Sequence, residues 1–370
     1  MTVALFSPLK LRELTLPNRI VVSPMCQYIS DDGASNDWHL MHYGQFSMGA
    51  GGLVMTEMTN VSAEARITTK CAGLYNDAQV VAAKRVVDFC RKFGAAKLGV
   101  QLAHAGRKGS TTPPALGGKS LTAAEGAWTT YAPSALAYAP DWHVPQALDR
   151  AGMDKVKADF VSAVKRADQV GYDLVEFHGG HGYLIHQFLS PLSNQRTDAY
   201  GGSAENRMRF PLEVFAAMRA AWPADKPMGI RVSAVDWVEG GLTIEQTIAF
   251  AKELKKLGCD YMDVSSGGVD PRQQVPLAPG YHAELAARVK KESGITTRTV
   301  GLITDAKLAE KIVASWQADM VAIGRAAMWD PRWAWHAALD LGTEANYPIR
   351  ATPCLPALRP QIFGVLKKAA

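Results

Sequence analysis

Two histidines and a tyrosine follow one short apolar run, and their side chains could polarise and protonate a substrate. The run is Leu174 to Phe177, and His178, His181 and Tyr183 come directly after it among glycines. A strand-length apolar run that ends in glycines predicts a buried strand that stops where the histidines begin. At its carboxyl end, two imidazoles could donate hydrogen bonds to a substrate oxygen while the tyrosine supplies a proton.

The same two histidines have other interpretations. A histidine near a strand end is often a structural residue or a metal ligand. In this segment no carboxylate or cysteine completes a zinc site with them, and we expect no metal. On this segment alone, a metal-dependent enzyme without redox chemistry, with His178 and His181 as ligands, stays an alternative.

The overall composition narrows the class of protein. The 370 residues are 48% hydrophobic and 20% charged, which is typical of a globular enzyme. The net charge of +5 is too mild for a nucleic-acid-binding protein, although it would help to attract a phosphate-bearing cofactor. No signal peptide or bilayer-length apolar segment is present, so we expect a cytoplasmic protein without a membrane partner. The five cysteines lack a Cys-x-x-Cys pair and predict free thiols.

Eight short apolar runs alternate with amphipathic segments of helical period. These segments predict helices such as Ala78–Phe93, Met153–Val170, Ala204–Ala221, Thr243–Leu257, Ala283–Lys291 and Asp305–Trp316. Continuous apolar strands predict a parallel sheet covered on both faces, and eight such units favour a single (β/α)₈ TIM barrel. An open doubly wound sheet is the alternative, but no Gly-x-Gly-x-x-Gly turn follows the first strand. The expected strands are Arg19–Pro24, Gly52–Glu57, Leu98–His104, Leu174–His178, Met228–Ser233, Tyr261–Ser265, Thr297–Gly301 and Met320–Gly324.

One long irregular stretch, Arg107 to Leu148, follows the third expected strand. An extended loop at this point would lie over the barrel mouth as a lid or rim. A surface excursion without a role is an equally open interpretation.

In such a barrel the chemistry lies at the carboxyl ends of the strands, and polar residues and glycines collect there. Gly301, Gly324 and Arg325 follow the last two strands, where barrels of this kind usually bind a phosphate. Gln101 and Arg231 project toward the barrel axis, and an amide beside a fixed cation suits a flavin ring. Alternatively, Arg231 only balances a buried carboxylate such as Glu176 or Glu57.

Several longer motifs follow one another along the chain. They are Ser23-Pro-Met-Cys26-Gln-Tyr28, Gln101-Leu-Ala-His-Ala-Gly-Arg-Lys108, His178-Gly-Gly-His181-Gly-Tyr183, Asn194 to Arg207, and Arg231-Val-Ser. Together they resemble the Old Yellow Enzyme family, and the pairing of Cys26 with Tyr28 is similar to its bacterial, thermophilic-like branch. The resemblance covers the chain from Phe6 to about Pro331.

The resemblance implies one FMN-binding barrel domain, residues 1–370, that takes a hydride from NADPH or NADH. The implied substrates are small electron-poor alkenes: α,β-unsaturated aldehydes, ketones, imides and nitroalkenes. Hydride would pass through flavin N5 to the alkene. Because one flavin face must hold the nicotinamide first and the alkene second, we expect ping-pong kinetics. A flavin barrel for another oxidation is the second redox possibility. A homo-oligomer, dimer or tetramer, is expected.

The resemblance also implies a role for each matching residue. Tyr183 would be the proton donor, His178 and His181 would bind the substrate oxygen with help from Tyr28, and Cys26 would tune the flavin. The implied FMN-binding residues are Ser23, Pro24, Met25, Cys26, Met58, Gln101, Arg231, Gly301, Gly324 and Arg325.

The sequence departs from the family pattern at two places. Met58 stands where the family has a small residue, and its side chain could narrow the flavin pocket. The carboxyl-terminal tail, about residues 345–370, could contact a neighbouring subunit, but its sequence does not clearly match the family's shared-site motif. Arg359 is the only candidate there for entering a neighbouring site.

Overall fold

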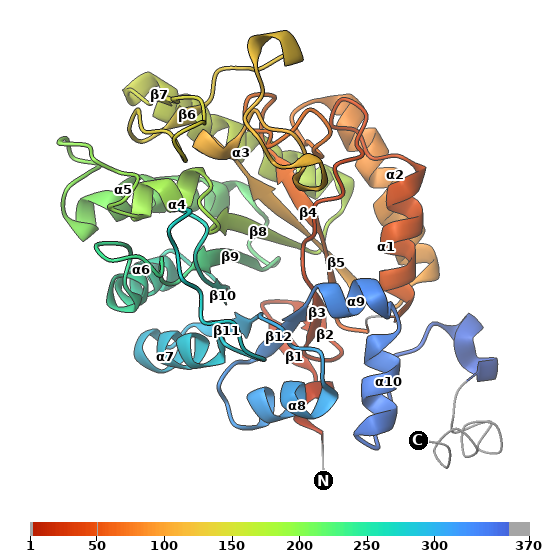
Figure 1. The fold of residues 1–370 in the computed structure, drawn as a ribbon. Coiled ribbons are helices and arrows are strands. Elements are labelled where there is room, and N and C mark those ends of the chain that lie inside the picture. The colour runs from red at the N-terminus through yellow and green to blue at the C-terminus, as the bar shows by residue number, and fades with distance from the viewer. Residues whose placement is uncertain (1–2, 50, 355–370) are drawn as a thin grey trace.

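The computed structural model describes residues 3–49 and 51–354, and its centre is a closed barrel of parallel strands (Figure 1). The strands follow one another around the barrel in the order β10, β11, β12, β3, β4, β5, β8, β9. The predicted (β/α)₈ barrel is therefore confirmed. Its strands are β3 (Ile20–Val22), β4 (Leu53–Asn60), β5 (Lys97–Ala103), β8 (Leu174–Gly179), β9 (Met228–Ser233), β10 (Tyr261–Ser265), β11 (Thr296–Thr299) and β12 (Met320–Ile323).

Helices surround the barrel on its outside (Figure 1). Five of them begin at a residue whose side chain accepts a backbone amide of the first turn, which satisfies one of the free donors at a helix start. These N-caps are Asn76, Asp149, Ser203, Thr243 and Asp305. The amphipathic helices are α2 (Asp77–Phe93), α3 (Arg150–Val170), α5 (Ala204–Ala221), α6 (Ile244–Lys256), α7 (Ala283–Ser293) and α8 (Ala306–Ala314).

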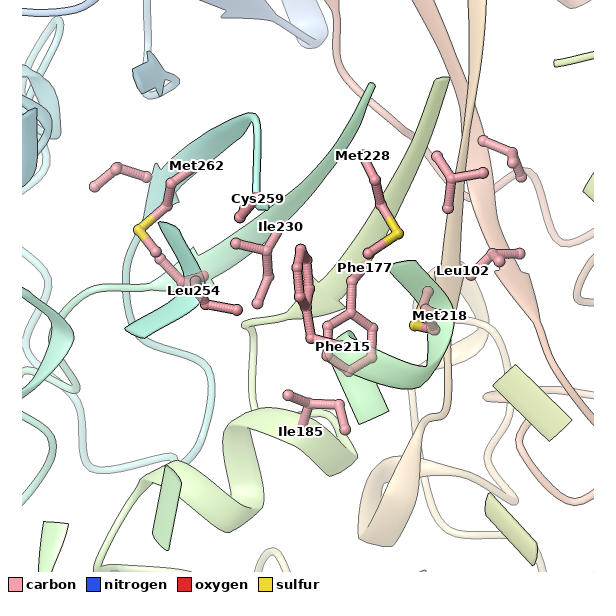
Figure 2. Close-up of a cluster of buried hydrophobic side chains, with 14 of the residues drawn as sticks. Leu102, Phe177, Ile185, Phe215, Met218, Met228, Ile230, Leu254, Cys259 and Met262 are labelled. Carbon is pink, nitrogen blue, oxygen red and sulfur yellow. The ribbon is translucent and has the colours of Figure 1, made fainter. Parts of the chain in front are cut away.

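Alternate residues of each strand point to opposite faces, and both faces of the strands are buried. On β8, Val175 and Phe177 pack outward in the main core, where the Phe177 ring lies 5.0 Å from that of Phe160 on α3. Figure 2 shows this outer layer around Phe177 and Phe215. The intervening residues of β8 face into the barrel, and this alternation brings Glu176 and then His178 toward the axis.

A hairpin closes the amino-terminal end of the barrel. It consists of β1 (Leu9–Leu11) and β2 (Leu14–Leu16), which pair antiparallel. Leu11 and Leu16 are buried in a cluster with interior strand residues such as Leu174 and Tyr261. The end opposite to the predicted site is thus filled with side chains, and ligands have to enter at the carboxyl ends.

The long stretch Arg107 to Leu148 carries short elements of its own and lies at the top of Figure 1. Three single-turn helices, η2 (Gly106–Lys108), η3 (Pro114–Leu116) and η4 (Ala123–Glu125), precede the strand pair β6 (Tyr131–Ala132) and β7 (Gln146–Ala147). The guanidinium of Arg107 donates to the carbonyls of Leu136 and Ala137 at 3.2 Å each and to that of Val269 at 2.8 Å. The stretch is therefore tied to the loop after β10.

Four helices lie outside the expected pattern. They are α1 (Asp37–Gly49), α4 (Leu184–Leu189), α9 (Arg325–Trp329) and α10 (Trp333–Asp340). The short helix η5 (Ile349–Cys354) begins the carboxyl-terminal tail, whereas Arg359 lies outside the described residues.

Candidate active site

A cavity of about 500 Å³ opens at the carboxyl ends of the strands. Its volume is within the roughly 300–1,000 Å³ that small-molecule sites occupy. Of the predicted site residues, five line it: His181, Arg231, Gly301, Gly324 and Arg325.

Two further predicted residues adjoin this cavity at Gly324. A Cβ atom added at Gly324 would lie 3.5 Å from Sδ of Met25 and 3.8 Å from Cβ of Ser23. Gly301 has φ +123°, and a Cβ there would lie 2.8 Å from the ring of Tyr281. Glycine at position 301 therefore keeps the cavity open where the predicted phosphate site lies.

Arg231 and Gln101 belong to a chain of polar contacts across the barrel interior. Gln101 donates to Glu176 at 2.8 Å, and the buried Arg298 contacts both Glu176 and Asp263, the latter at 2.8 Å. Asp263 in turn lies 3.3 Å from Nε of Arg231. The partner of Arg231 is thus Asp263 rather than Glu176 or Glu57. Arg298 was missed from the sequence, where it lies among threonines.

The cavity suits FMN in the chemistry of its lining. Two arginines face it, and no carboxylate does so among residues 3–49 and 51–354, which suits a dianionic phosphate. Ser23 Oγ is buried without a hydrogen-bond partner in the described chain. Buried polar atoms of this kind need a partner, and a polar cofactor ring would supply it.

His178 and His181 form a relay with Ser265. The amide of Gly180 donates to Nδ1 of His178 at 3.2 Å, so the proton of this neutral imidazole is on Nε2. That nitrogen lies 3.4 Å from Nδ1 of His181, whose Nε2 is 3.0 Å from the hydroxyl of Ser265. The hydrogen-bond directions therefore assign His178 as donor to His181, and His181 as donor to Ser265.

Burial keeps both imidazoles neutral and the nearby phenol protonated. Desolvation, followed by the charge of Arg231, lowers the pKa of His178 and of His181 well below the ordinary value. Desolvation, followed by the proximity of Cys26, raises the pKa of Tyr183 well above its ordinary value. The ring of Tyr183 lies 5.1 Å from that of His178. At neutral pH the site thus holds two neutral imidazoles beside an intact phenol.

A strained turn separates His181 from Tyr183. His181 has φ +55° and Gly182 has φ +75°, which puts two successive residues in the left-handed region. The amide of His181 donates to Ser233 at 2.9 Å, its carbonyl accepts Nζ of Lys108 at 2.9 Å, and the carbonyl of Gly182 accepts Nε2 of Gln187 at 2.7 Å. These contacts hold a conformation that a histidine rarely adopts.

Cys26, Tyr28 and Tyr183 pack together against a small cluster that includes Met58, and only Met58 of these is fully buried. The side chain of Met58 therefore fills space beside Cys26. Desolvation, followed by the carboxylate of Glu57, raises the pKa of Cys26 well above its ordinary value. Cys26 is a neutral thiol at physiological pH.

Glu57 fixes the loop that carries Cys26 and Tyr28, and the sequence did not reveal this role. It occupies a shift in register between β4 and β5 and is buried. Its Oε2 accepts the amide of Gln27 at 2.8 Å, and its Oε1 lies 3.1 Å from Nε2 of His39 on α1. Tyr28 is held at φ +52° directly after this contact.

Lys108 is another residue whose role was not predicted, although it belongs to one of the sequence motifs. Its Nζ donates at 2.9 Å to the carbonyls of His181 and Gly268 and lies 5.3 Å from the centre of the Tyr183 ring. Burial, followed by the charge of Arg107, lowers the pKa of Lys108 to about 8. Lys108 thus joins the loops after β8 and β10 around the proposed proton donor.

The alternative of a metal site lacks a ligand set in the described part of the chain. No cluster of three or more histidine, cysteine, aspartate or glutamate side chains there could hold a metal ion. No helix within residues 3–49 and 51–354 has the length and apolar character needed to cross a membrane.

The barrel and the arginine-lined cavity after its last strands have the arrangement of a phosphate-binding (β/α)₈ enzyme. The sequence model of the NADH:flavin oxidoreductase / NADH oxidase family matches residues 4–344. The chain belongs to this family, which is the Old Yellow Enzyme family that its motifs resemble.

Relatives are similar over nearly their whole length. An NADPH dehydrogenase of Geobacillus sp. (strain WCH70) is 39% identical over 95% of this chain and 98% of its own. An NADH:flavin oxidoreductase of Gibberella zeae is 41% identical over 92% of this chain and 86% of its own. The chain is accordingly an NAD(P)H-dependent flavin oxidoreductase with FMN as its cofactor.

Solved structures agree with this assignment. Morphinone reductase superimposes with a TM-score of 0.76 at 29% identity, covering 94% of this chain and 92% of its own. A structure of morphinone reductase in complex with tetrahydroNAD superimposes with a TM-score of 0.74. A 2-naphthoyl-CoA reductase superimposes with a TM-score of 0.82 at 23% identity, and this chain covers 53% of its length. At this identity the similarity concerns the fold alone.

Proposed function

We propose that the protein reduces activated carbon–carbon double bonds of small molecules with NADPH or NADH. The expected substrates are α,β-unsaturated aldehydes, ketones and imides, and nitroalkenes. Bound FMN would supply the hydride-transfer chemistry of a ping-pong cycle, with the nicotinamide in the first half-reaction and the alkene in the second. The observation that carries the proposal is the pair of neutral imidazoles beside a protonated tyrosine at the edge of the arginine-lined cavity.

His178 and His181 bind the carbonyl or nitro oxygen in this proposal, and Ser265 allows both to donate. In the relay, His178 donates to His181, so only one imidazole proton is directed toward the space between them. If the Ser265 hydroxyl rotates and donates to Nε2 of His181, the proton of His181 moves to Nδ1. Both imidazoles then donate to one substrate oxygen, which draws electron density from the alkene.

Tyr183 supplies the proton for the α-carbon. Its raised pKa keeps the phenol intact at neutral pH, and the carbanion-like carbon that forms during reduction is a far stronger base. Tyr28 lies in the same cluster and helps to place the substrate. Cys26, as a neutral thiol beside the ring, would tune the flavin without a charge.

The remaining predicted residues hold the cofactor in this proposal. Arg325, Gly324 and Gly301 would bind the phosphate, and Arg231 with Gln101 would bind the pyrimidine part of the ring. Ser23, Pro24, Met25, Cys26 and Met58 would line its other side. Gln101 already donates to Glu176, so its amide oxygen is the atom that is free to accept from the ring.

We also propose that the whole chain acts as one FMN-binding domain and assembles into a homo-oligomer. The tail from about residue 345 would contact a neighbouring subunit. Its first part packs on α10, where the rings of Trp335 and Tyr347 are 5.1 Å apart, while Ile349 is 87% exposed. An apolar side chain this exposed suits a subunit contact.

An absorption spectrum of the purified protein tests the proposal. We expect a yellow flavin that bleaches when NADPH is added without oxygen and regains its colour when cyclohexenone follows. Colour that bleaches with NADPH but does not return with any of the four alkene classes would contradict alkene reduction while leaving the flavin oxidoreductase intact.

Ser265→Ala is expected to weaken alkene binding about tenfold, the value of one hydrogen bond, because His181 loses the donor that sets its second tautomer. The dissociation constant of cyclohexenone, from the concentration dependence of flavin reoxidation, measures this. Ser266→Ala is the matched comparison, because Ser266 contacts His282 at 2.7 Å and not the histidine pair. Equal weakening by both substitutions would contradict the tautomer role of Ser265.

A further inference from the structure

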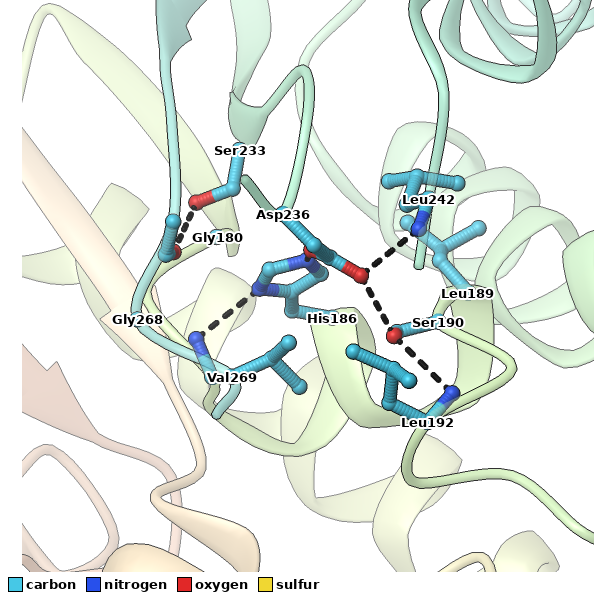
Figure 3. A network of polar contacts seen from close by, with 12 residues as sticks. Gly180, His186, Leu189, Ser190, Leu192, Ser233, Asp236, Leu242, Gly268 and Val269 are labelled. Atoms are coloured by element: carbon cyan, nitrogen blue, oxygen red, sulfur yellow. Dashed lines mark hydrogen bonds and ion pairs between the residues drawn. The ribbon is translucent and has the colours of Figure 1, made fainter. Parts of the chain in front are cut away.

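A buried histidine, His186, and a buried aspartate, Asp236, point toward each other (Figure 3), and His186 contacts Gly182 in the turn that precedes Tyr183. His186 is on α4, one turn after Gly182, and Asp236 is in the loop after β9. Nε2 of His186 is 2.8 Å from Oδ1 of Asp236, and both side chains are 0% exposed. Neither residue lines the cavity.

The hydrogen bonds of this pair fix which nitrogen of His186 carries the proton. The amide of Gly182 donates to Nδ1 at 2.9 Å, so Nδ1 must be unprotonated and Nε2 donates to Asp236. The other carboxylate oxygen accepts the hydroxyl of Ser190 at 2.6 Å and the amide of Leu242 at 2.7 Å. Asp236 therefore accepts only, and it enforces the tautomer that Gly182 needs.

The amide of Gly182 stands between the two side chains that would contact the substrate. A Cβ at Gly182 would lie 2.0 Å from the carbonyl oxygen of Gly268, so the turn is pressed against the loop after β10. His181 precedes it and Tyr183 follows it. If the Gly182 amide loses its acceptor, the spacing of His181 and Tyr183 changes, and a misplacement of about 1 Å can cost roughly 10²-fold in rate.

We propose that His186 and Asp236 are positioning residues for alkene reduction: Asp236 holds His186 as the Nε2–H tautomer, and His186 holds the Gly182 amide so that His181 and Tyr183 converge. The inference rests on the proposed roles of those two residues. It assigns to α4 and to the loop after β9 a function in the alkene step and not in FMN binding.

The tautomer of His186 is measurable without catalysis. In ¹⁵N-labelled protein, two-bond ¹⁵N–¹H correlations distinguish the two neutral tautomers from the imidazolium, and loss of one imidazole signal set in a His186→Asn variant assigns the residue. From the hydrogen-bond geometry we expect Nδ1 to be unprotonated and Nε2 to carry the proton. An imidazolium or an Nδ1–H form would overturn the proposal, because neither can accept from Gly182.

Asp236→Asn changes this tautomer with little change in volume. The amide oxygen must face the two donors Ser190 and Leu242, so the NH₂ group faces His186 and forces its proton onto Nδ1 against the Gly182 amide. We expect flavin reoxidation by cyclohexenone to slow roughly 10²-fold. Flavin reduction by NADPH should change no more than about threefold.

Ser190→Ala is the matched control, since it removes another hydrogen bond from the same carboxylate but leaves His186 in place. It should leave both half-reactions within about threefold of the wild type. Equal slowing by Asp236→Asn and Ser190→Ala would mean that the network only supports the fold, and would overturn the proposal.

Two substitutions at His186 keep the test decisive if Asp236→Asn does not fold. In His186→Asn the amide oxygen takes the place of Nδ1 and keeps the acceptor for Gly182. In His186→Gln the amide nitrogen takes the place of Nε2 and keeps only the contact with Asp236. We expect the asparagine variant to reoxidise about tenfold faster than the glutamine variant, and the opposite order would overturn the proposal.

The outcomes also separate this inference from the proposed function. If cyclohexenone never reoxidises the wild-type flavin, the proposed function fails while the tautomer measurement still decides whether Asp236 sets the state of His186. If the wild type reduces alkenes and His186 has the wrong tautomer, only the positioning proposal fails.

Discussion

Tyr183→Phe is expected to slow flavin reoxidation by cyclohexenone by roughly 10²–10⁴-fold, the usual contribution of a positioned general acid. The substitution removes one hydroxyl and leaves the ring that packs on His178, so the pocket keeps its shape. Flavin reduction by NADPH needs no proton from this residue and should change no more than about threefold. Stopped-flow absorbance of the flavin, recorded separately for each half-reaction, measures both rates.

Tyr28→Phe is the matched control for this prediction. Tyr28 is a second phenol in the same cluster, and burial likewise raises its pKa above the ordinary value. Because its proposed role is to place the substrate, its loss should weaken alkene affinity about tenfold and not remove proton transfer. Similar slowing of both half-reactions in Tyr183→Phe would count against Tyr183 as the donor.

The barrel could be predicted because its strands are buried on both faces. Strands such as Ile20–Val22 and Met320–Ile323 are apolar at every position, and eight short buried runs with helices between them allow few other folds. The rule that chemistry lies at the carboxyl ends then gave Arg231, Gly301, Gly324 and Arg325, which the structure brings to one cavity. Periodicity and position were sufficient for these residues.

Helix α1 was missed because its buried side chains do not look apolar in the sequence. Three of its buried residues are His39, His42 and Tyr43. His39 and Tyr43 contact Glu57 through polar atoms, and the ring of His42 packs against those of Tyr43 and Phe46. His39 is there to contact Glu57 at 3.1 Å. A helix whose inner face serves a buried carboxylate gives no hydrophobic period to detect.

The contacts that set the tautomers of His181 and His186 could not be predicted from the sequence, for a different reason. His181 and Ser265 are 84 residues apart, and His186 and Asp236 are 50 apart, so each pair depends on which strands are neighbours and in which register. A one-residue change of register would exchange inward and outward side chains. The resemblance to a known family named the residues that would touch substrate, but not those that orient them.

The ionic chain inside the barrel gives the second large prediction. Arg298 is fully buried and contacts Glu176 and Asp263, which are also fully buried. Burial alone would lower the pKa of Arg298 and raise that of Asp263. Their contact outweighs burial, so the pKa of Arg298 is raised and that of Asp263 is lowered. Arg298→Met would leave two buried carboxylates with the charge of one arginine, Arg231, which pairs with Asp263 at 3.3 Å.

Loss of one partner from a buried ionic network typically costs about 3–5 kcal/mol, because the remaining charge is uncompensated. We expect Arg298→Met to lower the free energy of unfolding at pH 7.5 by about this amount, as measured by urea unfolding with excess FMN in every sample. Arg288→Met is the matched control. Arg288 pairs with Glu245 and Glu292 at the surface, where its side chain is 45% exposed, and such pairs contribute about 0–1 kcal/mol.

The pH dependence separates lost charge from lost packing. In the wild type the pKa of Asp263 is lowered in the folded state. The contribution of Asp263 to the free energy of unfolding is therefore fully present above its unfolded pKa of about 4, and it is lost as the pH falls toward the folded pKa. In Arg298→Met we expect burial to raise the pKa of Asp263 in the folded state, because the largest opposing charge is gone. The folded variant then binds more protons than the unfolded chain, and its stability rises as pH falls.

The difference in free energy of unfolding between Arg298→Met and the wild type should therefore be smaller at pH 5.5 than at pH 7.5. A cavity or packing defect would give the same difference at both pH values. Adding Glu176→Gln to Arg298→Met should recover part of the loss at pH 7.5, because one of the two uncompensated charges is then absent. The difference in free energy of unfolding could instead be independent of pH and unaffected by Glu176→Gln. That result would contradict the prediction, because it would mean that the buried charges, including the Asp263–Arg231 pair beside the cavity, do not stabilise one another.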